Sequence, residues 1–197
     1  MIHIFGCGGH SLVVLDTLEA LNKTDIVFYD DKVITDPEFE QYKFGGAIAD
    51  CVPDKINDSF IVAIGNNAIR KNIFLKFSQQ MKALNPVHPS AIISKHSSIK
   101  QGSVVFAGAI INRKACIEEN VIINTGAIIE HECIIGSHTH VAPGSTLCGS
   151  VTIGENCLIG ANSTILPCLT VGAGSIIGAG SVVTKNVPPN TVVKNSY

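Results

Sequence analysis

Branched aliphatic residues recur every six positions through the second half of the chain. They run without interruption over sixteen steps: Ile93, Ile99, Val105, Ile111, Ile117, Ile123, Ile129, Ile135, Val141, Leu147, Ile153, Ile159, Ile165, Val171, Ile177 and Val183. A period of six suits short strands that meet at corners, three to a coil, with residue n about 4.8 Å from residue n+18. The pattern therefore predicts a parallel β-helix of about five coils rather than a β-sandwich, whose turns vary in length.

The first part of the chain lacks this period and alternates between strand and helix patterns. The predicted elements are strands at Ile2–Phe5, Ile26–Tyr29 and 60–64 and helices at 10–21 and 67–81. The loop NPVHPSAIIS carries two prolines and leads into the first hexads. We expect a Rossmann-like α/β nucleotide-binding domain at residues 1–84 and an all-β hexapeptide-repeat domain at residues 85–197.

The first predicted turn, GCGGHS at residues 6–11, is similar to a dinucleotide-binding loop, although Ser11 stands where that pattern has its third glycine. Glycine amides at a helix N-terminus suit a phosphate. The segment YDDK at residues 29–32 ends a strand where a carboxylate could reach ribose hydroxyls. These features favour one nucleotide, or a nucleotide-sugar; the alternative is a tight turn followed by a capped loop.

Composition limits the kinds of binding partner and the cellular compartment that we expect for this protein. The 197 residues are 46% hydrophobic and 15% charged, with a formal net charge of −2. Scattered lysines and arginines argue against a nucleic-acid or membrane surface, and no segment has the length and apolarity of a membrane span. Seven cysteines without a CxxC pair fit reduced thiols. We expect a cytoplasmic protein that binds small molecules.

Ionisable residues interrupt the repeat in the stretch IIEHECIIGSHTHVAPGS, residues 128–145. No two of the histidines at 96, 131, 138 and 140 are separated by a multiple of 18, so we expect no metal bound within one chain. His131 is flanked by two glutamates, and a histidine oriented by a carboxylate can deprotonate an amine or a hydroxyl. Glu132 is the preferred partner, while a solvated corner histidine remains the alternative.

Gly149 holds the position equivalent to His131, one full coil further along the predicted helix. With no side chain to block approach, a backbone N–H there could donate to the oxyanion of a tetrahedral intermediate. Above the imidazole we expect open space. The pattern therefore predicts acyl transfer.

Several motifs appear in an order that resembles the NeuD/PglD-type acyltransferases: GCGGH, YDDK, VAIGNNAIRKNI, HPSAIIS, INTGAIIEHECIIGSHTHVAPGS and LIGANSTILP. The resemblance covers nearly the whole chain. It implies a left-handed β-helix, a homotrimer with active sites between adjacent helices, and acetyl-CoA as donor to the amino group of a UDP- or dTDP-linked 4-amino-4,6-dideoxy sugar for surface glycan biosynthesis.

The resemblance also assigns roles by position. His131 matches the general base, Glu132 its orienting carboxylate, Asn124 an acceptor contact, His140 a second active-site histidine on the coenzyme side, and Gly149 the amide that meets the thioester carbonyl. The matches to the acceptor's nucleotide-binding loops are Gly9, His10, Asp30, Asp31, Gly65 and Asn66. The final segment TVVKNSY departs from the family pattern, so no coenzyme contact is carried over there.

Three other functions remain open at the level of the sequence. The nearest is O-acetylation of sialic acid, because a hydroxyl needs the same base. A non-catalytic β-helix would show a regular ladder of identical surface residues, whereas the exposed positions here vary. A zinc-dependent trimeric hydratase would contain metal.

Overall fold

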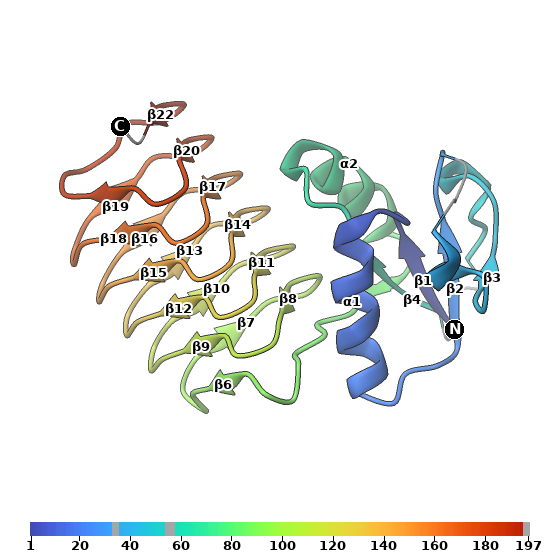
Figure 1. Ribbon diagram of the computed structural model, residues 1–197. Helices are drawn as coiled ribbons and strands as arrows, with labels where there is room; N and C mark the ends of the chain where they lie inside the picture. Colours follow the sequence, from blue (N-terminus) through green and yellow to red (C-terminus); the bar gives the residue numbers. More distant parts are fainter. Residues whose placement is uncertain (33–35, 54–57, 195–197) are drawn as a thin grey trace.

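The computed structural model describes residues 1–32, 36–53 and 58–194. An α/β domain lies beside a β-helix, whose coils rise from β6 at the bottom of the view to β22 at the top (Figure 1). The predicted fold class, an α/β domain followed by a parallel β-helix of hexapeptide coils, is confirmed. The division of the chain at residue 84 stays a prediction.

The α/β domain is built on a parallel sheet with the strand order β3-β2-β1-β4-β5. Its elements are β1 (Ile2–Phe5), α1 (Gly9–Ala20), β2 (Ile26–Tyr29), the 3₁₀ helices η1 (Pro37–Phe39) and η2 (Ile48–Asp50), β3 (Lys43–Phe44), β4 (Ser59–Val62), α2 (Asn67–Phe77) and β5 (Lys82–Ala83). Side chains of α1 pack on one face of the sheet and those of α2 on the other. Both faces of β1 and β2 are therefore buried, which is why these strands read as continuous apolar runs.

Several bounds differ from the predicted elements. The strand predicted at 60–64 spans Ser59–Val62, and the helix predicted at 10–21 spans Gly9–Ala20. The second helix ends at Phe77 instead of continuing to residue 81, because the amides of Gln80 and Met81 bond the Phe77 carbonyl in a turn. The strands β3 and β5 were not predicted, since each has two residues and shows no periodicity.

Every strand of the β-helix has two residues. The strands are β6 (Ile92–Ile93), β7 (Ser98–Ile99), β8 (Val104–Val105), β9 (Ile110–Ile111), β10 (Cys116–Ile117), β11 (Ile122–Ile123), β12 (Ile128–Ile129), β13 (Ile134–Ile135), β14 (His140–Val141), β15 (Thr146–Leu147), β16 (Thr152–Ile153), β17 (Leu158–Ile159), β18 (Thr164–Ile165), β19 (Thr170–Val171), β20 (Ile176–Ile177), β21 (Val182–Val183) and β22 (Val192–Val193).

The register of the three β-helix sheets confirms the predicted coil length. Ile123 pairs with Val141 and Ile129 with Leu147, in each case the third hexad position further along the chain. The repeated aliphatics fill the core, and Ile129 and Leu147 are fully buried. The last coil is shorter than the others, because Ile177 pairs with Val193 rather than with the residue three hexads on.

Backbone conformation at the corners fixes where the polar side chains stand. Corner residues three places after a repeated aliphatic often have positive φ, among them Lys114 (63°), Glu132 (61°), His138 (64°) and Ser150 (60°). This left-handed conformation is uncommon for residues other than glycine, asparagine and aspartate. Lys114, Glu132 and Ser150 stack at the same corner of successive coils, and Glu132 holds the place next to His131.

The two domains share a hydrophobic core. Val104, Phe106 and Ile122 of the β-helix belong to one buried cluster with Val14 and Leu18 of α1. The sheet that contains β8, β11 and β14 is therefore the face that receives the α/β domain. Among the described residues, no helix has the length and apolarity required to cross a bilayer.

Candidate active site

A cavity of ≈ 650 Å³ opens at the carboxyl ends of β1, β2 and β4. This edge is where ligands of parallel α/β sheets usually bind. Its lining includes five of the residues predicted to contact the acceptor: Gly9, His10, Asp30, Asp31 and Gly65. The structure therefore brings these positions together around one space.

The glycine turn before α1 is shaped by a close approach to the segment that follows β4. Gly6 has φ of 110°, and a Cβ there would lie 2.7 Å from Ile64 Cγ1. Space is open beyond Gly8 and Gly9, and no side chain caps α1 at Gly8. Ser11 is buried and its hydroxyl donates to the Gly8 carbonyl, so it braces the turn. The start of α1 thus presents backbone N–H groups without a capping side chain.

The two aspartates after β2 differ in how they are held. The Asp30 carboxylate accepts from the Cys7 N–H at 2.7 Å and from the Lys32 N–H at 2.8 Å, so both oxygens support backbone. Asp31 accepts from the Ile48 N–H through one oxygen at 2.9 Å. Burial, with a smaller contribution from Asp30, raises the pKa of the Cys7 thiol to about 12, so this thiol stays protonated.

Asn66 does not line the cavity. Its side chain caps α2 by accepting from the Ile69 N–H at 3.1 Å. The loop is thereby fixed in an orientation in which Gly65 faces the cavity. The geometry gives Asn66 a role in ending this loop and starting α2.

His10 and His140 meet where the two domains join. Their ring centroids are 6.0 Å apart. His140 Nε2 lies 3.0 Å from Asn124 Nδ2, and the Asn124 oxygen accepts from the Thr125 N–H. Burial, assisted by the charge of Arg70, lowers the pKa of His10 to about 4 and that of His140 to about 3. Both imidazoles are therefore neutral at physiological pH.

His131 and Glu132 stand at an exposed corner between β12 and β13. His131 Nδ1 is 3.5 Å from Glu132 Oε2. Lys114 Nζ lies 2.9 Å from Glu132 Oε1, and this hydrogen bond is the main cause that lowers the pKa of Glu132. Glu132 is thus an ionised carboxylate placed beside one ring nitrogen of His131, the arrangement that a general base requires.

Gly149 lies against the imidazole of His131. A Cβ at Gly149 would be 2.6 Å from both Cε1 and Nε2 of the ring. The predicted stacking of Gly149 on His131 is therefore correct. The predicted open space between them is wrong, because the imidazole packs against Gly149 and fills the place that a side chain there would take. The Gly149 carbonyl accepts from the Cys168 N–H, while its own N–H has no acceptor among the described residues.

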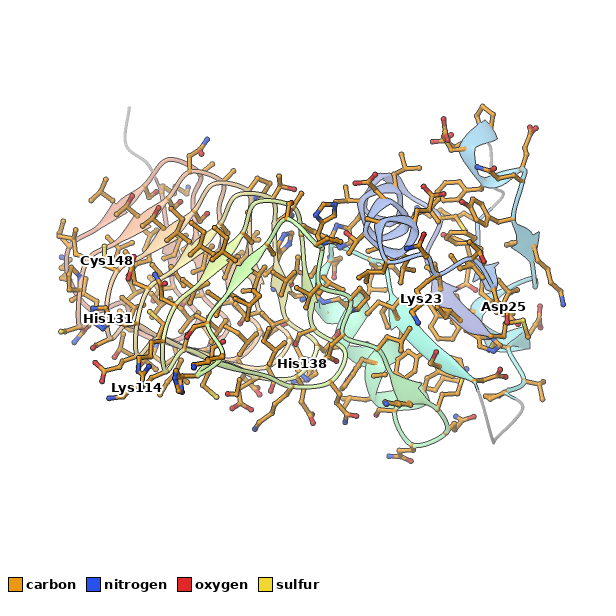
Figure 2. All side chains as sticks on the ribbon, turned by 90° about the horizontal axis from the view of Figure 1, so that it is seen from below. Lys23, Asp25, Lys114, His131, His138 and Cys148 are labelled. Atoms are coloured by element: carbon orange, nitrogen blue, oxygen red, sulfur yellow. The ribbon has the colours of Figure 1, made fainter. Side chains whose placement is uncertain are left out.

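The predicted residues form two separate groups within one chain. His131, Lys114 and Cys148 lie on the side of the β-helix that faces away from the α/β domain, whereas His138 lies toward that domain (Figure 2). The cavity is in the α/β domain. One chain therefore does not bring its own His131 to its own cavity.

Two polar residues at these sites were not predicted. Lys114 precedes Glu132 by one coil, so the coil spacing could have revealed it. Arg70 binds mainly backbone carbonyls, which no side-chain pattern in the sequence reveals. In the described ranges, no group of three or more His, Cys, Asp or Glu side chains is arranged to hold a metal ion.

Models of known protein families match both domains of the chain. The model described as PglD N-terminal domain matches residues 1–77. The model described as bacterial transferase hexapeptide (six repeats) matches residues 114–149 and 150–185.

Solved structures resemble the whole chain. The acetyltransferase domain of PglB from Neisseria gonorrhoeae is 31% identical, with a TM-score of 0.90 and coverage of 97% of this chain and 94% of that chain. The same domain is known in complex with acetyl coenzyme A. A mutant of perosamine N-acetyltransferase from Caulobacter crescentus, in complex with CoA and GDP-perosamine, is 31% identical, with a TM-score of 0.87 and coverage of 97% and 91%.

A curated relative matches over a shorter range. UDP-N-acetylbacillosamine N-acetyltransferase from Bacillus subtilis is 35% identical over 113 residues, 54% of this chain and 51% of that protein, so the match spans about half of the relative's length. Together with the full-length structural matches, these similarities define a hexapeptide-repeat transferase with an N-terminal PglD domain. The chain belongs to the NeuD/PglD-type acyltransferase family.

Proposed function

We propose that the chain is an acetyl-CoA-dependent N-acetyltransferase that acts on the amino group of a UDP- or dTDP-linked 4-amino-4,6-dideoxy sugar. The observation that carries this proposal is the His131–Glu132 pair packed against Gly149, in a chain that resembles an acetyltransferase domain over 97% of its length. The acetyl-CoA complex of that domain and the CoA and GDP-perosamine complex of a second relative support the donor and the class of acceptor.

The cavity of the α/β domain suits the nucleotide part of such an acceptor. Backbone N–H groups at the start of α1 provide a favourable site for a diphosphate. Asp31 lines the same cavity and keeps one carboxylate oxygen outside its bond to Ile48, so it is placed to accept from sugar hydroxyls. Asp30 contributes by holding the glycine turn in shape.

The corner residues suit direct acyl transfer. His131 accepts a proton from the amine through Nε2 as the amine attacks the thioester carbonyl, while Nδ1–H donates to Glu132. The carboxylate, kept ionised by Lys114, stabilises the imidazolium that forms. The Gly149 N–H stabilises the oxyanion. His131 then returns the proton to the departing sulfur, so an amide and free CoA result.

Separation of His131 from the cavity supports a site shared between copies of the chain. We propose a homotrimer in which the corner of one subunit meets the α/β domain of its neighbour, since cyclic symmetry supplies each corner with one such domain. Strand residues of the sheet that contains β12 expose aliphatic surface, with Ile92 65% and Val182 63% exposed. Burial of these side chains between subunits would favour assembly.

The test is release of CoA thiol from acetyl-CoA in the presence of UDP-, dTDP- and GDP-linked 4-amino-4,6-dideoxy sugars, with sialic acid and its CMP form as comparison acceptors. Release with an amino sugar, and a product that carries one amide-linked acetyl group, is the expected result. Release only with the sialic acid acceptors, or with none of the panel, would overturn the proposal.

A further inference from the structure

Arg70 joins the two domains through a buried guanidinium. The residue lies on α2 and is 1% exposed. Within its own domain it donates to the carbonyls of Ile64 at 3.2 Å and Gly65 at 3.1 Å. Across the seam it donates to the carbonyls of His138 at 2.7 Å and Asn120 at 3.3 Å.

Other contacts already hold α2 against the β-helix, so the charge of Arg70 is not needed for that attachment. Lys71 pairs with Glu155 at 3.5 Å, and the Asn67 amide donates to the Cys157 carbonyl at 2.9 Å. Phe74 also packs edge-on against the ring of His138. No carboxylate bonds Arg70 among the described residues, and burial lowers the pKa of Arg70 to about 9. Burial of an unpaired charge is costly, so a neutral side chain would hold the helix at lower cost.

The atoms that Arg70 joins lead directly to the cavity wall and to the strand that carries His140. On one side, Gly65 lines the cavity and its carbonyl also interacts with the His140 imidazole. On the other side, the carbonyls of His138 and Thr139 belong to the backbone that leads into β14, where His140 begins the strand. One guanidinium therefore sets the distance between the cavity wall and the strand that carries His140.

We propose that Arg70 is a positioning residue for acceptor binding: it fixes the Ile64–Gly65 wall of the cavity relative to β14 and His140, so that the acceptor is held in one orientation with respect to the β-helix. The proposal rests on the proposed function for its kinetic consequence. Its structural consequence, immobilisation of the cavity wall, is independent of any substrate.

Three variants separate positioning from general stability. Arg70→Met removes the hydrogen bonds and keeps much of the apolar volume, and Arg70→Lys retains the charge with fewer donors. Phe77→Leu is the matched control, because Phe77 is buried on the same helix but packs in the cluster on the sheet side. Melting temperature, the KM values for acceptor and acetyl-CoA, and hydrogen–deuterium exchange at residues 64–67 are measured for each.

We expect Arg70→Met to raise the acceptor KM by about tenfold or more, which corresponds to loss of at least one hydrogen bond to a charged group. The KM for acetyl-CoA should change less than about twofold. Exchange at residues 64–67 should be faster in Arg70→Met than in Phe77→Leu at matched loss of melting temperature, with Arg70→Lys between Arg70→Met and the wild type.

Equal exchange and equal acceptor KM in Arg70→Met and Phe77→Leu would overturn the proposal and leave Arg70 a purely structural residue. If Arg70→Met does not fold, the comparison between Arg70→Lys and Phe77→Leu decides in the same way. If the wild-type protein acetylates no acceptor, the proposed function fails, and hydrogen exchange alone still decides whether Arg70 fixes the wall.

Discussion

The imidazole of His131 occupies the space that a side chain at Gly149 would need. The two residues lie one coil apart, and a Cβ at Gly149 would stand 2.6 Å from His131 Nε2. Glycine at this position therefore decides where the ring can lie. The absence of a side chain also leaves the Gly149 N–H accessible to a reacting carbonyl.

Replacement of Gly149 by alanine tests this relationship. The added methyl group should push the ring away from its place beside Glu132, and we expect kcat to fall by about 10² or more, within the range for loss of base catalysis. The melting temperature should change little, because the displaced ring is 59% exposed. Cys148→Ala, at the preceding position, is the control; equal kcat values in the two variants would contradict the assigned contact.

Glu132 and Glu130 flank His131 but make different contacts. Glu132 approaches the ring nitrogen Nδ1, whereas Glu130 accepts from the His131 backbone N–H at 3.3 Å. Glu132→Gln removes the charge that stabilises the imidazolium, so we expect kcat to fall by about tenfold to 10². Glu130→Gln should stay within about twofold of wild type. Steady-state kinetics give kcat for both variants. A larger loss of kcat in Glu130→Gln than in Glu132→Gln would assign the orienting role to Glu130.

Much of the fold could be predicted because it depends on local periodicity. Each hexad aliphatic points inward wherever the coil has three strands, so the core residues from Ile93 to Val183 follow from spacing alone. The same spacing placed Gly149 beside His131 and would have placed Lys114 beside Glu132. The two-residue strand β3 could not be predicted, since it is too short to show periodicity and its place depends on parallel pairing with β2.

Contacts between domains were beyond prediction for a different reason. Arg70 acts on backbone carbonyls whose positions depend on how α2 docks on the coils. The separation of His131 from the cavity likewise follows from which sheet of the β-helix receives the α/β domain. Neither relationship leaves a pattern in the order of residues.

Stability should depend on pH through His10 and His140. In the unfolded chain both imidazoles take up protons near pH 6.5, but in the folded protein their pKa values are about 4 and about 3. Below pH 6.5 the unfolded state binds more protons, so the free energy of unfolding should decrease as the pH falls toward these values. The expected slope is on the order of 1 kcal/mol per pH unit for each histidine.

Urea unfolding between pH 7 and pH 5 at fixed protein concentration measures this slope. The double variant His10→Gln, His140→Gln should show a shallower pH dependence than the wild type, whatever its absolute stability. Identical slopes would mean that the two histidines are not held neutral at the domain seam.

A shared site predicts complementation between two inactive variants. Gly65→Val should block the cavity, because nothing lies within 4 Å of a Cβ at Gly65 and the larger side chain would project into that space. His131→Ala removes the base. After the two proteins are unfolded together and refolded as random mixed trimers, about one quarter of the sites should contain an intact corner and an intact cavity.

Recovery of about that fraction of wild-type kcat, with no recovery when the proteins are mixed without subunit exchange, is the expected outcome. Mixed trimers that remain inactive would show that each active site is formed within one chain. Subunit exchange itself is checked by mass spectrometry of trimers that carry two different tags.

In the proposed mechanism, His131 removes the proton from the acceptor amine. The most direct measurement is kcat of His131→Ala with the best amino-sugar acceptor, with His96→Ala, an exposed corner histidine of the same β-helix, as the control. We expect a decrease of about 10² to 10⁴ for His131→Ala, with unchanged acceptor KM, melting temperature and oligomeric state. A kcat equal to that of the wild type would contradict it.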